Sequence, residues 1–158
     1  MVDDRSVVRL AGEGRTLGAG SNVITYKLAS AETTGAFSVL ERVVPPHFQS
    51  PPQPHTNTRE DWAAYVLDGV LAFQLEDREV TAPAGSLVFV SRGVFFRWWN
   101  PQAETARCLM IYAPAGFEEY FSEVTDATKD APRGPLDYER TLPAILRIQD
   151  KYGMRRRE

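Results

Sequence analysis

Short apolar runs separated by turn residues fill the first two thirds of the sequence. Residues 62–67 and 70–75 form the clearest pair, and Asp68-Gly69 stands between them. An Asp-Gly pair in this position predicts a β-hairpin, because glycine adopts positive φ without a steric penalty. Other runs rich in β-branched and aromatic residues also predict strands. These runs are residues 7–10, 22–28, 37–44, 86–90, 94–100 and 106–112.

The pattern changes after residue 114. Residues 117–121 are typical of a helix start, and residues 142–152 place Leu142, Ile145 and Ile148 on one helical face. Residues 11–21 and 126–138 are interpreted as loops, and the proline-rich residues 50–54 as an extended segment. Many short strands followed by one or two helices predict an all-β sandwich or barrel in a single domain of 158 residues.

The region before the Asp-Gly pair carries the first of two motifs. Counting back from Gly69 places Trp62, Asn57 and His55 at the Glu and two His positions of the pattern G-x5-H-x-H-x3,4-E-x6-G, and Gln49 at its opening Gly. This spacing resembles the first motif of the cupin superfamily. The motif's scaffold spacing is kept, but only His55 retains a residue type that binds metal in that family.

The second cupin motif, G-x5-P-x-G-x2-H-x3-N, is matched in the same partial way. Gly85, Gly93 and Asn100 occupy their positions, whereas Ser91 replaces the Pro and Phe96 replaces the His. The resemblance spans roughly residues 36–121 and is similar to compact bacterial cupins. It implies a cupin-type jelly-roll barrel over about residues 22–114, with a helical C-terminal extension over about residues 115–158 and a site inside the barrel.

Strand alternation then predicts which side chains face that interior. If His55 points inward, so does Asn57, and the same holds for Phe96 and Trp98. The result is an aromatic pocket with two polar groups. We predict His55 as general base and Asn57 as the group that polarises the substrate, with substrate bound by Trp62, Phe96, Trp98, His47 and Val66.

One histidine is too few ligands for a transition metal, which needs three or four N, O or S donors. We therefore expect neither a bound metal nor another cofactor. Replacement ligands remain possible from His47, Glu41, Glu60, Asp61 or Cys108. Cys108 is also interpreted as a small buried hydrophobe.

Charge and composition narrow the partners. The net charge of −3 gives no reason to expect nucleic acid or an anionic membrane, and the basic residues 155–157 are interpreted as a solvated tail. No apolar run has transmembrane length, no apolar signal segment follows the N-terminus, and the single cysteine precludes an internal disulfide. These features predict a soluble cytoplasmic protein. The resemblance implies a homodimer through the outer sheet faces and the N-terminal strand.

Three function classes remain open. The first is a metal-independent enzyme of non-redox type (isomerase, cyclase, lyase or hydrolase) acting on an aromatic or polyketide-like small molecule, as in secondary metabolism. The second is a protein that binds a hydrophobic small molecule without reaction. The third is a metal-dependent cupin dioxygenase or isomerase with substituted ligands. The sequence favours the first class, because His55 and Asn57 both face an otherwise apolar pocket.

Overall fold

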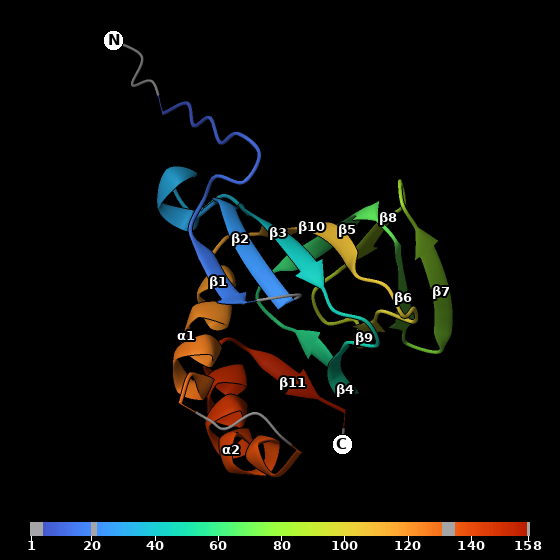
Figure 1. Cartoon of the computed structure of the whole chain (residues 1–158). Helices are drawn as coiled ribbons and strands as arrows, with labels where there is room; N and C mark the ends of the chain where they lie inside the picture. Colours follow the sequence, from blue (N-terminus) through green and yellow to red (C-terminus); the bar gives the residue numbers. More distant parts are fainter. Residues whose placement is uncertain (1–4, 20–21, 131–134, 158) are drawn as a thin grey trace.

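Two antiparallel β-sheets face each other and form the body of the molecule (Figure 1). The computed structural model describes residues 5–19, 22–130 and 135–157. The six-stranded sheet has the order β1-β2-β3-β10-β5-β8 and the five-stranded sheet the order β11-β4-β9-β6-β7. The strands of the first sheet are β1 (Thr16–Ala19), β2 (Asn22–Leu28), β3 (Ser38–Val44), β5 (Asp61–Asp68), β8 (Leu87–Val90) and β10 (Ala106–Ala113). Those of the second are β4 (Gln49–Asn57), β6 (Val70–Leu75), β7 (Arg78–Pro83), β9 (Phe96–Trp99) and β11 (Met154–Arg156).

The chain changes sheets at Gly69, so the hairpin predicted there is wrong. Strand β5 pairs with β8 and β10, whereas β6 pairs with β7 and β9. Gly69 has φ +75°, and a Cβ at this position would lie 3.0 Å from the Cβ of Ala106. Glycine is therefore needed where the chain crosses closely from one sheet to the other. The hairpin in this part of the chain is formed by β6 and β7 and turns at Glu76, which has φ 51°.

The C-terminal extension closes one end of the sandwich. It contains α1 (Glu118–Thr128), α2 (Pro135–Lys151) and β11, which lies beside β4 in Figure 1. The two predicted helices are confirmed. The basic residues 155–157 are solvated as predicted, since their side chains are exposed, but they are not a free tail: Arg155 and Arg156 pair with Thr56 and His55 in the second sheet. The barrel core accordingly includes a strand from the extension.

Other boundaries differ as well. The loop predicted over residues 11–21 contains β1, which pairs with β2, whereas residues 7–10 form no strand. A short 3₁₀ helix, Ser30–Glu32, joins β2 to β3. Residues 131–134 of the predicted loop 126–138 lie outside the described residues, and α1 and α2 occupy most of the rest of it. None of the helices in the described ranges is long and apolar enough to cross a membrane.

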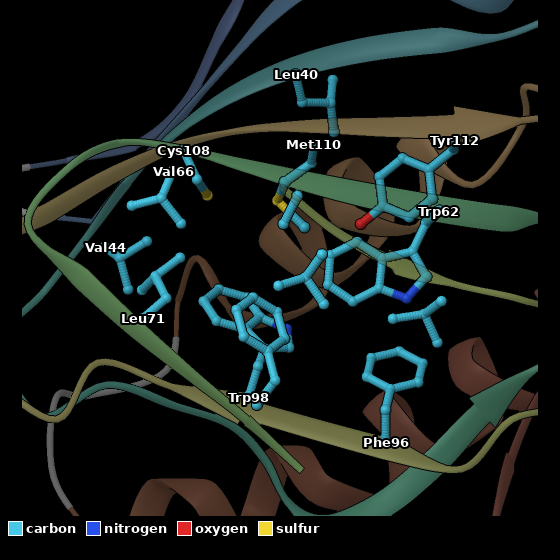
Figure 2. Packing of buried hydrophobic residues seen from close by; sticks show 14 of the residues in the cluster. Leu40, Val44, Trp62, Val66, Leu71, Phe96, Trp98, Cys108, Met110 and Tyr112 are labelled. Atoms are coloured by element: carbon cyan, nitrogen blue, oxygen red, sulfur yellow. The ribbon is translucent and has the colours of Figure 1, made fainter. Parts of the chain in front are cut away.

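The core lies between the sheets and follows the predicted alternation. Along β3, Ser38, Leu40, Arg42 and Val44 are buried while the residues between them are partly exposed. The predicted inward residues of β4, β5 and β9 are buried too, although in β4 the intervening Thr56 is also buried. Figure 2 shows one end of the core with the rings of Trp62, Phe96 and Tyr112, the other with Val44, Val66 and Leu71, and Trp98 between the two. The aromatic end is the one that the C-terminal extension covers.

Candidate active site

A cavity of about 30 Å³ lies at the aromatic end of the barrel. A space of this size holds about one or two water molecules. Both sheets contribute to its wall, and the start of α1 together with β11 closes its remaining side. Its lining residues are Arg42, Ser50, His55, Asn57, Trp62, Phe96, Trp98, Met110, Tyr112, Phe117, Tyr120, Phe121 and Met154.

Five of the seven predicted site residues line this cavity, namely His55, Asn57, Trp62, Phe96 and Trp98. They come from β4, β5 and β9, and all five are buried. Their convergence follows from the pleat, because alternate residues of each strand face the space between the sheets. The alternation read from the sequence therefore placed these side chains correctly.

His47 and Val66 do not line the cavity. His47 is exposed in the turn between β3 and β4, where it adopts φ 54° and its backbone N–H donates to the Gln102 carbonyl. Val66 points inward as expected, but it packs beside Val44 and Leu71 at the aliphatic end of the core (Figure 2). Val66 lies further along β5 than Trp62 and is therefore away from the aromatic end of the core.

His55 is a buried imidazole in an apolar setting. Its ring lies 4.3 Å from that of Phe96, centroid to centroid, and its Nδ1 atom has no hydrogen-bond partner in the described structure. Burial lowers the pKa of His55 to about 4, although a hydrogen bond with the Gln53 backbone acts in the opposite direction. The imidazole is therefore neutral at physiological pH and can accept a proton or a hydrogen bond.

Asn57 and Glu60 form a buried polar pair close to His55 in the sequence. The Asn57 side chain hydrogen-bonds the Glu60 carboxyl, while Asn57 Oδ1 and Glu60 Oε1 are without partners in the described residues. Burial raises the pKa of Glu60 to about 7, against the nearby positive charges of Arg59 and Arg92. Asn57 thus presents an acceptor oxygen, not the amide donor that the role of polariser requires. Glu60 lies behind it and does not line the cavity.

Trp62 supplies a donor to the same space. Its Nε1–H is buried and has no partner in the described structure. The indole stacks on Tyr112 with ring centroids 6.0 Å apart and lies 5.1 Å from Phe96. Figure 2 shows these rings facing one another around the space between the sheets. The cavity therefore combines aromatic walls with a few unpaired polar atoms.

Sequence reasoning missed several lining residues. Arg42 and Tyr112 occupy inward positions of β3 and β10, so the same alternation that located Trp62 would have found them. Phe117, Phe121 and Met154 carried no such signal, because only the docking of the C-terminal extension brings them to the barrel.

The four positions that bind metal in the resembling motifs do converge, but their chemistry does not fit a transition metal. Among them only His55 Nδ1 and Asn57 Oδ1 are free donor atoms, and Trp62 and Phe96 fill the remaining positions with rings. In the described residues no group of three or more His, Cys, Asp or Glu side chains is placed to hold a metal ion.

The possible replacement ligands are held elsewhere. Asp61 accepts hydrogen bonds from the backbone and guanidinium of Arg92, and Glu41 pairs with Arg107 on the outer face. Cys108 is buried away from the cavity lining, and burial raises the pKa of its thiol to about 12. With His47 in a surface turn, none of these side chains completes a ligand set around His55.

Comparison with known proteins supports the resemblance. Residues 40–112 match the family model described as "Cupin domain". Similar solved structures share the fold described above, so the chain has a cupin-type fold. No curated protein sequence matches this chain.

The similar solved structures are distant from this chain in sequence. KdgF from Halomonas sp. is 11% identical with a TM-score of 0.62, over 72% of this chain and 98% of that one. Pac13 from Streptomyces, described as a nucleoside dehydratase, is 18% identical with a TM-score of 0.55, over 72% and 87%. The cupin domain of Cnp3 from Schizosaccharomyces pombe is 13% identical with a TM-score of 0.53, over 70% and 78%. At these identities the likeness concerns the fold alone.

Proposed function

We propose that this protein is a metal-independent enzyme that catalyses a non-redox step on an aromatic or polyketide-like small molecule bound in the barrel. The observation that carries this proposal is a set of four buried polar atoms without partners in the described structure, on side chains that line one cavity. They are Arg42 Nε and, among the predicted site residues, His55 Nδ1, Asn57 Oδ1 and Trp62 Nε1.

Unpaired buried polar atoms are costly, at about 1–3 kcal/mol each, and folded proteins contain few of them. Four on side chains that line one cavity are explained by a ligand that supplies the missing partners. Such a ligand has an acceptor for Trp62 Nε1–H and at least one donor for Asn57 Oδ1 or His55 Nδ1. The surrounding rings favour a flat aromatic body, since offset aromatic stacking adds to apolar burial.

In the proposed reaction, neutral His55 takes a proton from a substrate O–H or C–H group. Asn57 Oδ1 accepts a hydrogen bond that orients the substrate, and Trp62 Nε1–H donates to the oxygen on which negative charge develops. This division of roles replaces the expectation that Asn57 is the polarising donor. Isomerisation, cyclisation, elimination and hydrolysis all fit proton transfer of this kind.

The cavity must enlarge to admit such a substrate. A cavity of about 150 Å³ holds benzene, which is several times the 30 Å³ present here. Phe117, Tyr120, Phe121 and Met154 close the cavity from the C-terminal extension, whereas the other lining residues belong to the two sheets. We therefore place the substrate entrance at the extension.

Pac13 gives limited support from the fold. It is described as a nucleoside dehydratase, which is a non-redox enzyme built on a similar barrel. At 18% identity this is an analogy between folds, because function depends on the residues of each site.

The low pKa of His55 favours a second candidate, a binding protein that does not catalyse a reaction. A base whose pKa is about 4 has little driving force to remove a proton near pH 7. His55 and Asn57 would then be hydrogen-bond anchors only. The two candidates share the pocket and differ in turnover.

A thermal-shift screen of aromatic metabolites, followed by mass spectrometry of each hit after incubation, tests the proposal. We expect hits that wild type converts and that His55→Ala binds but converts about 10² to 10⁴ times more slowly. His47→Ala is the matched control, because His47 is the only other histidine and is exposed. Trp62→Ala should weaken binding by about 2 kcal/mol or more through lost apolar contact.

Each other result has a defined meaning. Binding without conversion by wild type would support the binding protein over the enzyme. Hits that stabilise wild type and Trp62→Ala equally would show that the ligand binds outside this cavity. Equal losses in His47→Ala and His55→Ala would remove the assigned role of His55.

A further inference from the structure

Arg42 is a cation inside the barrel wall. It lies on the inner face of β3 between Leu40 and Val44, both fully buried, and is itself 6% exposed. The guanidinium is held among aromatic rings, with Cζ 4.5 Å from the centroid of Phe48 and 5.1 Å from that of Trp98. It also lines the cavity that contains the candidate active site.

Part of the hydrogen-bonding capacity of Arg42 is unused. Its Nη2 donates to Asn22 Oδ1 across a long 3.4 Å, and Nε has no partner in the described residues. No carboxylate in the described part of the chain forms an ion pair with it. Burial lowers the pKa of Arg42, and the titratable groups that oppose this effect are Cys108, Tyr112 and Tyr120, none of which is a carboxylate.

A buried guanidinium without an anion is unfavourable. Transfer of a charge from water to a protein interior is repaid only when an opposite charge and further hydrogen bonds are present. Aromatic faces return part of this free energy, but they do not use the N–H donors. The unpaired Nε–H therefore points to a partner for Arg42 other than the described residues of the chain.

There is space for that partner on both sides of Arg42. A second cavity, of about 180 Å³, lies between β1, β2 and α1. Arg42 and Phe121 line both this cavity and the smaller one inside the barrel. The larger cavity exceeds the volume of about 150 Å³ that holds benzene, so a small molecule can reach the guanidinium from this side.

We propose that Arg42 binds the carboxylate or phosphate of an anionic aromatic ligand whose ring lies at the barrel cavity. This inference rests on the proposed function and narrows its substrate class to anions. The planar guanidinium can give two parallel hydrogen bonds to either group, which an amide or hydroxyl of the ligand cannot match. Neutral analogues leave the buried charge without a partner and are rejected for that reason.

Matched pairs of probes test the inference by isothermal titration calorimetry. The pairs are benzoate with benzamide, phenyl phosphate with phenol, and indole-3-acetate with indole-3-acetamide. We expect wild type to bind at least one anion about tenfold or more tighter than its neutral partner, as for a charge-assisted hydrogen bond. Benzoate and phenyl phosphate distinguish a carboxylate ligand from a phosphate ligand.

Arg42→Met keeps the length and apolar contacts of the side chain and removes the charge. It should abolish the preference for the anion, while Arg42→Lys should retain part of it. Arg107→Met is the matched control, since Arg107 is exposed and pairs with Glu41 on the outer face of β10. Without ligand, Arg42→Met should raise Tm by about 2–4 °C, because a buried charge without a counterion is removed.

The outcomes separate this inference from the proposed function. Equal affinity for both members of every pair, with Trp62→Ala still weakening the binding, overturns the anion site and leaves the barrel pocket standing. If no probe binds wild type, the anion site is overturned. An anion preference that persists in Arg42→Met also overturns the anion site. If Arg42→Met does not fold, an anion preference in Arg42→Lys equal to that of wild type overturns it.

Discussion

His55 and Phe96 face each other across strands β4 and β9, with their Cα atoms in register and their rings 4.3 Å apart. In the resembling cupin motifs, these two positions both carry histidine. Here one imidazole packs against a phenyl ring at an interplanar angle of 52°. Two positions that bind a metal in the motifs therefore form an aromatic contact in this chain. The strand pairing is the same, but the chemistry of the side chains differs.

The first prediction concerns metal binding. We expect purified protein to retain well under one equivalent of transition metal, because His55 is the only strong donor at the four converging positions. Elemental analysis after expression with added iron, zinc, manganese and nickel measures this. One equivalent of any of these metals that remains after dialysis would contradict the prediction.

A variant of this chain supplies the positive control. Combining Asn57→His, Trp62→Glu and Phe96→His restores the ligand types of the resembling motifs on the same strands. This variant should take up metal under conditions in which wild type does not. Equal uptake by both proteins would show that the metal is bound outside the barrel.

Much of this site could be predicted from the sequence because it depends on strand alternation. Period 2 along β4 and β9 places His55, Asn57, Phe96 and Trp98 on one face, whatever the order of strands in the sheets. The same rule locates Arg42, which stands between Leu40 and Val44 in a run read as a strand. The motif comparison does not include Arg42, because β3 lies before the first motif.

The remaining features depend on tertiary packing. The Asp-Gly turn at Gly69 has the local chemistry of a hairpin, but the partners of β5 and β6 are distant strands, and this pairing decides the path of the chain. In β11, Met154 is buried against the barrel while Arg155 and Arg156 stay exposed. Three residues with two arginines give no strand signal, and only pairing with β4 orders them.

Glu60 should make the protein less stable as pH rises. Burial raises its pKa from the ordinary value of 4.5 to about 7, so the folded state holds a proton that the unfolded state releases. Its contribution to the free energy of unfolding is fully present below pH 4.5 and is lost as pH rises through 7. The His55→Gln variant isolates this effect, because it removes the titration of His55. Its free energy of unfolding, measured with urea, should fall by up to about 3 kcal/mol as pH rises across that window.

His55 should act with the opposite sign. Its pKa is lowered from 6.5 to about 4, so the unfolded state binds the proton more readily. The contribution of His55 is fully present above pH 6.5 and is lost as pH falls through 4. The free energy of unfolding of Glu60→Gln should therefore rise by up to about 3 kcal/mol between pH 4 and 6.5. In wild type the two effects oppose each other, so its free energy of unfolding should be nearly constant between pH 4.5 and 6.5. Parallel profiles in the two variants would refute both assignments.

Gly153 fixes the approach of β11 to the barrel. It has φ +76°, and a Cβ there would lie 2.6 Å from Thr58 Oγ1, which donates a hydrogen bond to the Gly153 carbonyl. Gly85 has a similar φ of +89° but open space around it, so Gly85→Ala is the matched control. We expect Gly85→Ala to lower the free energy of unfolding by about 1–2 kcal/mol and Gly153→Ala by at least about 1 kcal/mol more. Chemical denaturation measures both, and equal losses would mean that the clash is relieved without cost.

The last prediction is that the protein forms a homodimer through strand β8. This strand is an edge of the six-stranded sheet, and its outer face carries Leu87 and Phe89 at 63% and 58% exposure beside Tyr65 of β5. An edge strand with large exposed apolar side chains is a site for pairing with a second copy. Light scattering should give twice 17.7 kDa for wild type at micromolar concentration and the monomer mass for Leu87→Glu combined with Phe89→Lys. Thr81→Glu, at an exposed position of β7, which is an edge strand of the other sheet, should remain dimeric. A monomeric wild type would contradict the dimer, and a dimer that survives the β8 substitutions would move its interface to another face.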